Sequence, residues 1–185
     1  MDTLDNFIQV FNDILPHDVC DRVVNEYSQT DEWEDARIEN HRIDKNYRRV
    51  SLIPISAQQI IDNNKEVRTA LDADIFQGAA KVIAKYNQLV VCDVKRDTGY
   101  DLLRYQTGGF YKVHTDSATD TMRTLSCSFI LNDDYEGGGW EFFNGEIKLN
   151  PPKGSAIVFP SNFLYPHAIT PVIAGTRYSI VTWFV

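Results

Sequence analysis

The chain has 185 residues, of which 43% are hydrophobic, and a formal net charge of -8. This length predicts one domain with a substantial core, and the negative charge disfavours nucleic acid or anionic membranes as partners, because phosphate groups attract basic surfaces. No apolar run approaches the roughly 20 residues that span a bilayer, so no membrane partner is expected.

The start of the chain and its cysteines favour a cytoplasmic protein. Residues 1–6 are polar and do not form a secretory leader. Cys20, Cys92 and Cys127 are odd in number and include no Cys-x-x-Cys pair, which predicts reduced thiols.

Helices are expected in the first half of the chain. One is predicted from about Pro16 to Ser28, where apolar residues recur at helical spacing. A second start is marked by the capping-box pattern of residues 56–59. A third is predicted from about Ala73 to Tyr86, with an apolar side made of Ile75, Phe76, Ala79, Val82, Ile83 and Tyr86.

Strands are expected after about residue 98. Leu125, Cys127, Phe129 and Leu131 alternate with other residues at a period of two, and glycines and prolines mark turns at 137–139 and 150–154. We therefore predict a mainly β protein with N-terminal helices (α+β), built on a double-stranded β-helix, or jelly roll. Residues 1–185 are expected to form one domain, in which a helix-rich part, 1–97, supports a jelly-roll core, 98–185.

Two histidines and an aspartate predict a metal site. His114 and Asp116 are two residues apart, so on an extended segment their side chains project to the same side. His167, from a distant segment, would complete a set of two histidines and one carboxylate, which points to non-haem Fe(II) oxygenases. Zinc tolerates the same three residues, so the ligands alone do not decide the metal.

An arginine near the C-terminus predicts an anion clamp. Arg177 and Ser179 share a face of the predicted strand 177–185, which is rich in β-branched and aromatic residues. A guanidinium beside a hydroxyl is suited to holding a carboxylate. An iron site together with this clamp implies a dicarboxylic cosubstrate.

These residues resemble the Fe(II)- and 2-oxoglutarate-dependent dioxygenases, in the branch of the prolyl 4-hydroxylases and related phage and bacterial hydroxylases. The resemblance covers nearly the whole chain. Its segments are 102–116, 131–139, Pro166–His167, 175–179 with Trp183, and 11–16 followed by Cys20, which looks like the opening helix of that branch.

The resemblance implies roles for individual residues. His114, Asp116 and His167 would hold Fe(II), Arg177 would pair with the far carboxylate of 2-oxoglutarate, and Ser179 and Tyr105 would hydrogen-bond it. Succinate and CO2 would be released as O2 is used to hydroxylate a C–H bond, with ascorbate a further candidate cofactor. Residues that match positions near the substrate peptide are Arg123 and Trp183.

Two departures distinguish the chain within that branch. Collagen-type prolyl 4-hydroxylases use lysine where this chain has Arg177, which places it nearer the oxygen-sensing and microbial enzymes. The oxygen sensors carry a tyrosine two residues before the asparagine of the Leu131-Asn132 pair, and here that residue is Ile130. One cosubstrate hydrogen bond is therefore missing or supplied by another residue.

Three hypotheses follow. The leading one is a hydroxylase of a prolyl or similar side chain in a peptide or protein. The second is a hydroxylase of a free amino acid or small molecule on the same scaffold. The third is a non-catalytic jelly-roll binding module with a structural metal, which would leave Arg177 unexplained. The sequence does not indicate the oligomeric state.

Overall fold

The computed structural model describes residues 3–38, 42–56, 65–117 and 122–185. The elements of the first half are η1 (Leu4–Phe7), β1 (Gln9–Phe11), α1 (His17–Tyr27), β2 (Glu34–Asp35), β3 (Arg48–Arg49), β4 (Ser51–Pro54) and α2 (Lys65–Tyr86). Those of the second half are β5 (Asp101–Tyr105), β6 (Phe110–His114), β7 (Leu125–Ile130), β8 (Glu136–Gly137), β9 (Trp140–Phe142), η4 (Phe143–Gly145), β10 (Ile147–Leu149), β11 (Ala156–Pro160), β12 (His167–Ile169), β13 (Val172–Ala174) and β14 (Arg177–Phe184).

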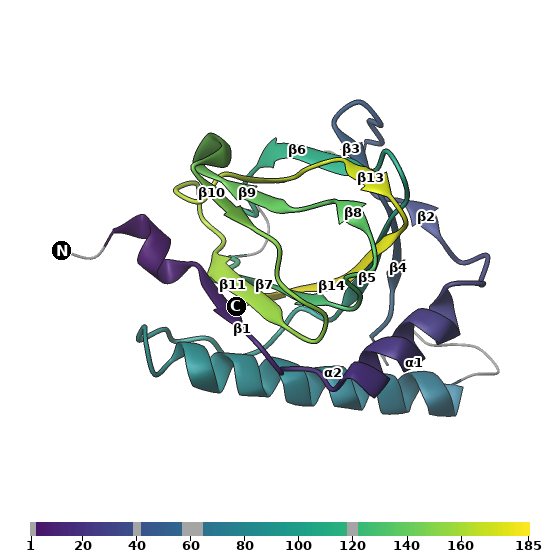
Figure 1. The fold of residues 1–185 in the computed structure, drawn as a ribbon. Coiled ribbons are helices and arrows are strands. Elements are labelled where there is room, and N and C mark those ends of the chain that lie inside the picture. The colour runs from purple at the N-terminus through teal and green to yellow at the C-terminus, as the bar shows by residue number, and fades with distance from the viewer. Residues whose placement is uncertain (1–2, 39–41, 57–64, 118–121) are drawn as a thin grey trace.

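Two antiparallel sheets make up most of the described fold. The larger has seven strands in the order β1-β11-β7-β14-β5-β4-β2, and the smaller has five in the order β10-β9-β12-β6-β3. They face each other across the interior, and α1 and α2 lie against the outer face of the larger sheet (Figure 1). Strands β8 and β13 form a separate pair.

The central strands of the larger sheet are buried on both faces. In β5, Leu102 packs with the helices on the outer side, whereas Leu103 packs with the core between the sheets. In β7, Cys127 and Phe129 face the helices, and Ser126 and Ser128 alternate with them. Because alternate residues face opposite sides, two serines on the inner face give the space between the sheets a polar wall.

The expected helices are partly confirmed. Helix α1 occupies His17–Tyr27 and begins after Pro16, as predicted, with Cys20, Val23 and Tyr27 buried along one side. Helix α2 ends at Tyr86 as predicted, but it begins at Lys65, eight residues before the predicted start. The capping-box start predicted at 56–59 involves residues 57–59, which lie outside the described residues.

Other expectations for the first half were wrong. Residues 11–16 are not helical: Phe11 ends β1, which pairs with β11, and the helix starts only at His17. The apolar side of α2 excludes Phe76, which is 52% exposed. The first half is also less helical than expected, because β4 pairs with β5 and extends the larger sheet.

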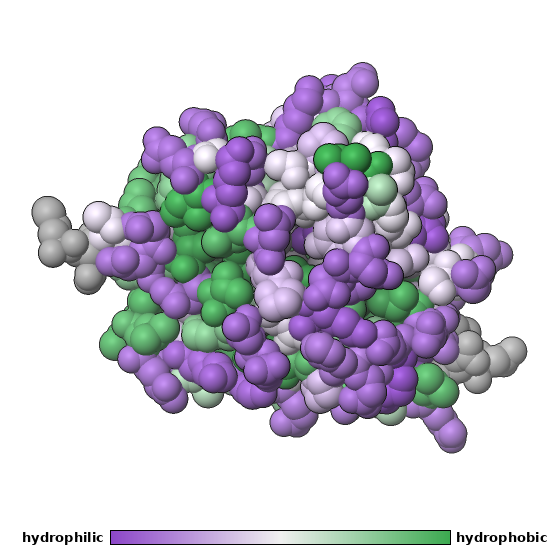
Figure 2. Space-filling model, viewed as in Figure 1, coloured by the Kyte–Doolittle hydropathy of each residue, from purple (hydrophilic) through white to green (hydrophobic). Residues whose placement is uncertain are grey.

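The surface agrees with the polar composition. The face shown in Figure 2 is largely hydrophilic, with hydrophobic side chains gathered in patches between hydrophilic ones. None of the helices formed by the described residues has both the length and the apolar character that crossing a bilayer requires.

Candidate metal and cosubstrate site

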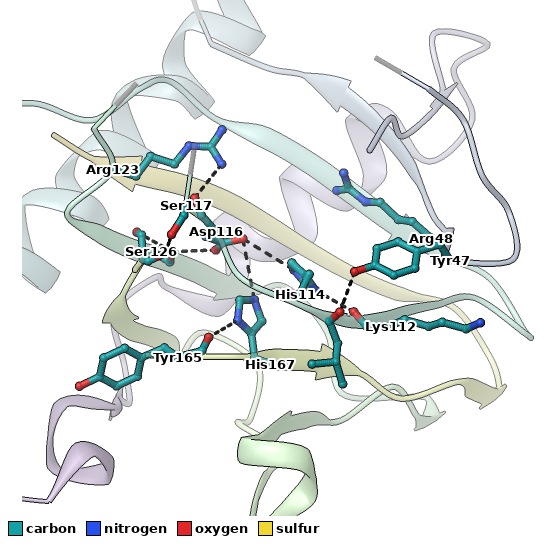
Figure 3. A network of polar contacts seen from close by, with 12 residues as sticks. Tyr47, Arg48, Lys112, His114, Asp116, Ser117, Arg123, Ser126, Tyr165 and His167 are labelled. Carbon is teal, nitrogen blue, oxygen red and sulfur yellow. Dashed lines mark hydrogen bonds and ion pairs between the residues drawn. The ribbon is translucent and has the colours of Figure 1, made fainter. Parts of the chain in front are cut away.

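His114, Asp116 and His167 meet on the smaller sheet. His114 is the last residue of β6 and His167 the first of β12, and these two residues are partners in the antiparallel pairing of the strands. The Nε2 atoms of His114 and His167 lie 3.6 and 3.9 Å from Asp116 Oδ1. One ligand atom from each of the three residues lies within 4.8 Å of the others, and Figure 3 shows the side chains converging.

Backbone carbonyls fix how the two imidazoles face the site. The Nδ1 of His114 lies 2.8 Å from the carbonyl oxygen of Lys112, and the Nδ1 of His167 lies 3.1 Å from that of Tyr165. A carbonyl can only accept, so each Nδ1 carries the hydrogen and each Nε2 keeps its lone pair. Burial, and next the nearby His167, lower the pKa of His114 from 6.5 to about 3, which keeps its imidazole neutral.

Asp116 supplies the negative charge of the cluster. Its Oδ2 accepts a hydrogen bond of 2.7 Å from the Ser126 hydroxyl on β7, so Oδ1 remains for a metal. Burial acts to raise the pKa of Asp116, but the imidazoles of His167 and His114 and the Ser126 hydrogen bond outweigh it and lower that pKa. Two imidazole nitrogens and a carboxylate oxygen on one side of an ion fit a divalent metal such as Fe(II), with further positions open.

Arg177 lies on the facing sheet with unused hydrogen-bond donors. The side chain is fully buried, and its Nη1 donates to Ser179 Oγ at 2.9 Å. Among the described residues, its Nε and Nη2 have no acceptor and no carboxylate forms an ion pair with it. These two nitrogens lie on one edge of the planar guanidinium, where they form a two-pronged fork for a carboxylate. Because a buried cation is stable only with a counter-charge, the site fits an anionic ligand.

Tyr105 and a glycine turn complete the surroundings of Arg177. Tyr105 on β5 is the strand partner of Arg177, and the guanidinium carbon lies 4.9 Å from the centre of its ring. Gly138 has φ +64°, and a Cβ atom there would lie 3.0 Å from Cδ of Arg177. The glycine run thus forms the turn expected from the sequence and also leaves room for the arginine.

A cavity of about 750 Å³ connects the two groups of residues. All eight residues singled out from the sequence line it: Tyr105, His114, Asp116, Arg123, His167, Arg177, Ser179 and Trp183. The guanidinium of Arg123 stacks 3.6 Å from the ring centre of Trp183, and its Nη1 donates to the backbone oxygen of Asp116 at 3.3 Å.

Sequence reasoning missed several residues at this site. Ser126 binds Asp116, and Arg48, Asp101 and Trp140 line the cavity. Asp101 could have been found from the strand pattern, since it lies two and four residues before Leu103 and Tyr105 on the same face. Ile130, already named from the sequence, is the strand partner of Ser179, is buried and offers no polar side-chain atom there.

The fold and the site together define a non-haem iron enzyme that uses an oxo-acid cosubstrate. Residues 100–185 match the family model of the 2OG-Fe(II) oxygenase superfamily. Across these residues the chain matches that superfamily, and it is prolyl 4-hydroxylase-like. Its class is that of the 2-oxoglutarate-dependent dioxygenases, with Fe(II) and 2-oxoglutarate as metal and cosubstrate.

Individual relatives agree with this class. The chain is 27% identical over 184 residues to a PKHD-type hydroxylase of Synechococcus sp. (strain CC9605), a match that covers 92% of the chain and 74% of the relative. It is 35% identical over 138 residues to a PKHD-type hydroxylase of Thermosynechococcus vestitus, a match that covers 68% of the chain and 58% of the relative.

A solved structure shares the fold. It is a prolyl hydroxylase of Trichoplax adhaerens in complex with a peptide fragment of the oxygen degradation domain of hypoxia inducible factor. The two superpose with a TM-score of 0.80 over 97% of this chain and 83% of that one, at 19% identity.

Proposed function

We propose that the chain hydroxylates a C–H bond of a prolyl residue in a peptide or protein, with succinate and CO2 as co-products. The observation that carries the proposal is the cavity that joins the His-Asp-His cluster to the unpaired fork of Arg177. The prolyl substrate rests on the relatives: the similar Trichoplax structure is that of a prolyl hydroxylase with a bound peptide.

The proposed division of labour follows the two sheets. His114, Asp116 and His167 would hold Fe(II) on the smaller sheet, and Arg177, Ser179 and Tyr105 would hold 2-oxoglutarate on the larger one. The iron and the cosubstrate, when bound, supply the oxidation of the C–H bond, a chemistry that side chains alone do not provide. We further propose that the two sheets form a double-stranded β-helix and that residues 1–185 form one domain.

The side chains themselves bind, orient and exclude water. The Lys112 and Tyr165 carbonyls hold the imidazoles with Nε2 toward the metal position. The Ser179 hydroxyl accepts from Arg177, so its own hydrogen is free to donate to a carboxylate oxygen. Because Arg177 is fully buried, its pairing with a carboxylate is screened little by solvent. Arg123 and Trp183, at the same cavity, would contact the substrate.

Replacing His167 with alanine tests the proposal. We expect succinate formation to fall to background, because one of three metal ligands is lost, while the far-ultraviolet circular dichroism stays unchanged. His17→Ala is the matched control: His17 is an exposed residue at the start of α1, and its loss should leave succinate formation intact. Wild-type turnover by His167→Ala would contradict the assignment.

The substrate requires a separate measurement. Proline-containing peptides and free L-proline would be incubated with Fe(II), 2-oxoglutarate and O2, and mass spectrometry would detect the gain of one oxygen atom. Oxygen gain in a peptide that requires 2-oxoglutarate supports the proposal. Oxygen gain only in the free amino acid would favour a small-molecule hydroxylase.

A further inference from the structure

Trp140 carries a buried hydrogen-bond donor that nothing in the described structure uses. It is the first residue of β9, its side chain is 7% exposed, and its Nε1 has no acceptor among the described residues. A buried donor without a partner costs about 1–3 kcal/mol, so native proteins rarely keep one. The indole nitrogen therefore requires an explanation.

The position of the indole ring suggests a ligand as the missing acceptor. The ring centre lies 5.5 Å from that of His167 and 5.9 Å from the guanidinium carbon of Arg177. Trp140 thus neighbours both a proposed metal ligand and the proposed clamp, and it lines the same cavity. Together with Nε and Nη2 of Arg177, it brings three buried donors without acceptors to one region. A group that only accepts hydrogen bonds, such as a carboxylate, would satisfy all three.

The side chain at position 130 of the larger sheet cannot donate a hydrogen bond to a carboxylate held by Arg177. Ile130 is the strand partner of Ser179, is buried and has an apolar side chain. A carboxylate offers about four lone-pair sites. The fork of Arg177 uses two and the Ser179 hydroxyl one, so Tyr105, which lines the same cavity, and Trp140 are the donors available for the fourth. Trp140 lies on the other sheet and approaches this region from the opposite side.

We infer that the Nε1–H of Trp140 donates a hydrogen bond to the 2-oxoglutarate carboxylate held by Arg177, in place of the contact that Ile130 cannot make. This inference rests on the proposed function, because it needs 2-oxoglutarate in the cavity. It makes Trp140 a cosubstrate-binding residue of this chain.

Nuclear magnetic resonance of the tryptophan indoles tests the inference directly. The protein would be loaded with Zn(II), a diamagnetic substitute for iron, and titrated with 2-oxoglutarate and with 2-oxopentanoate, which lacks the far carboxylate. We expect 2-oxoglutarate to shift the Trp140 indole N–H signal downfield and 2-oxopentanoate to leave it in place. The Trp33 signal serves as an internal reference, since its Nε1 already donates to the Tyr27 carbonyl.

Calorimetry of Trp140→Phe provides a second readout. The variant keeps an aromatic ring but loses the donor, so we expect 2-oxoglutarate to bind about 10- to 100-fold more weakly. The affinities for Zn(II) and for 2-oxopentanoate should not change. Trp33→Phe, which removes an indole outside the cavity, should bind 2-oxoglutarate as the wild type does.

Two results would overturn the inference. One is a Trp140 signal that 2-oxoglutarate leaves unmoved or that both oxo acids shift equally; this readout uses the wild type and does not depend on the folding of a variant. The other is wild-type affinity for 2-oxoglutarate in folded Trp140→Phe. In both cases 2-oxoglutarate still binds the wild type, and the proposed function stands. If the wild-type protein with Zn(II) binds no 2-oxoglutarate, the proposed function fails as well.

Discussion

Replacing Arg177 with methionine should separate the stability of the empty protein from its affinity for 2-oxoglutarate. The arginine is fully buried, makes one hydrogen bond to Ser179, and leaves two donors without acceptors among the described residues. Exchanging a buried ionic group for an apolar one of similar volume is often neutral or stabilising by about 1–4 kcal/mol. In a protein of this size, 1 kcal/mol changes the Tm by about 2–4 °C. The metal-free variant should therefore unfold at the wild-type temperature or above it.

The same change should greatly reduce cosubstrate binding. Removing one partner of a buried, hydrogen-bonded charge pair costs about 2–5 kcal/mol, which corresponds to roughly 30-fold to several thousand-fold in Kd. Calorimetric titration of the Zn(II)-loaded protein with 2-oxoglutarate measures this loss. Thermal unfolding provides a check, because a ligand at 100 times its Kd stabilises the folded state by about 2.7 kcal/mol. At the same ligand concentration, the gain in Arg177→Met should fall to about 1 kcal/mol or less.

Arg104→Met is the matched control. Arg104 precedes Tyr105 on β5, and its guanidinium stacks on Trp33 at 4.1 Å, outside the cavity. Its replacement should leave the affinity for 2-oxoglutarate unchanged. The reasoning is refuted if Arg177→Met unfolds well below the wild type while binding 2-oxoglutarate equally well.

Two further predictions concern the support of the metal site and stability in acid. Ser126→Ala removes the hydrogen bond to Asp116 Oδ2, and loss of such a partner typically weakens metal binding about 10- to 100-fold. Competitive Zn(II) titration measures this loss, with Ser128→Ala as the control. Equal losses of Zn(II) affinity in both variants would argue against a specific role for Ser126. Hydrogen bonds from Arg68 lower the pKa of Glu32 below 4.5, so its contribution to stability is present above that pH and is lost as the pH falls through the lowered value. Urea unfolding from pH 6 to about pH 3 should therefore show a smaller decrease for Glu32→Gln than for the wild type, and parallel curves would contradict this.

The expectations that the structure bears out rest on local geometry. Alternation along β14, the strand expected at 177–185, places Arg177 and Ser179 on one face. Asp116 lies two residues beyond the end of β6, yet it reaches His114 as expected. The helix expected after Pro16 is confirmed as α1, and it could be predicted because its apolar side recurs at helical spacing in the sequence.

The features that were missed depend on contacts between distant segments. Phe76 fits the apolar periodicity of α2 although the helix turns it toward solvent. Ser126 acquires a role only because β7 lies across from Asp116. Trp140 reads as an ordinary core residue of a strand until the fold places it beside Arg177. Spacing along the chain carries no information about these approaches.

The proposed metal ligands His114 and His167 belong to one sheet and the proposed clamp to the other, so the distance between the sheets sets the distance between the ion and the clamp. Phe142 and Phe159 pack in the core that separates them. A change in the thickness of that layer would move the oxo acid relative to the ion without altering any residue that touches either. Both rings also pack against His167, with ring centres 5.5 and 4.7 Å from that of the imidazole, so substitutions that resize them would shift a proposed metal ligand relative to the clamp.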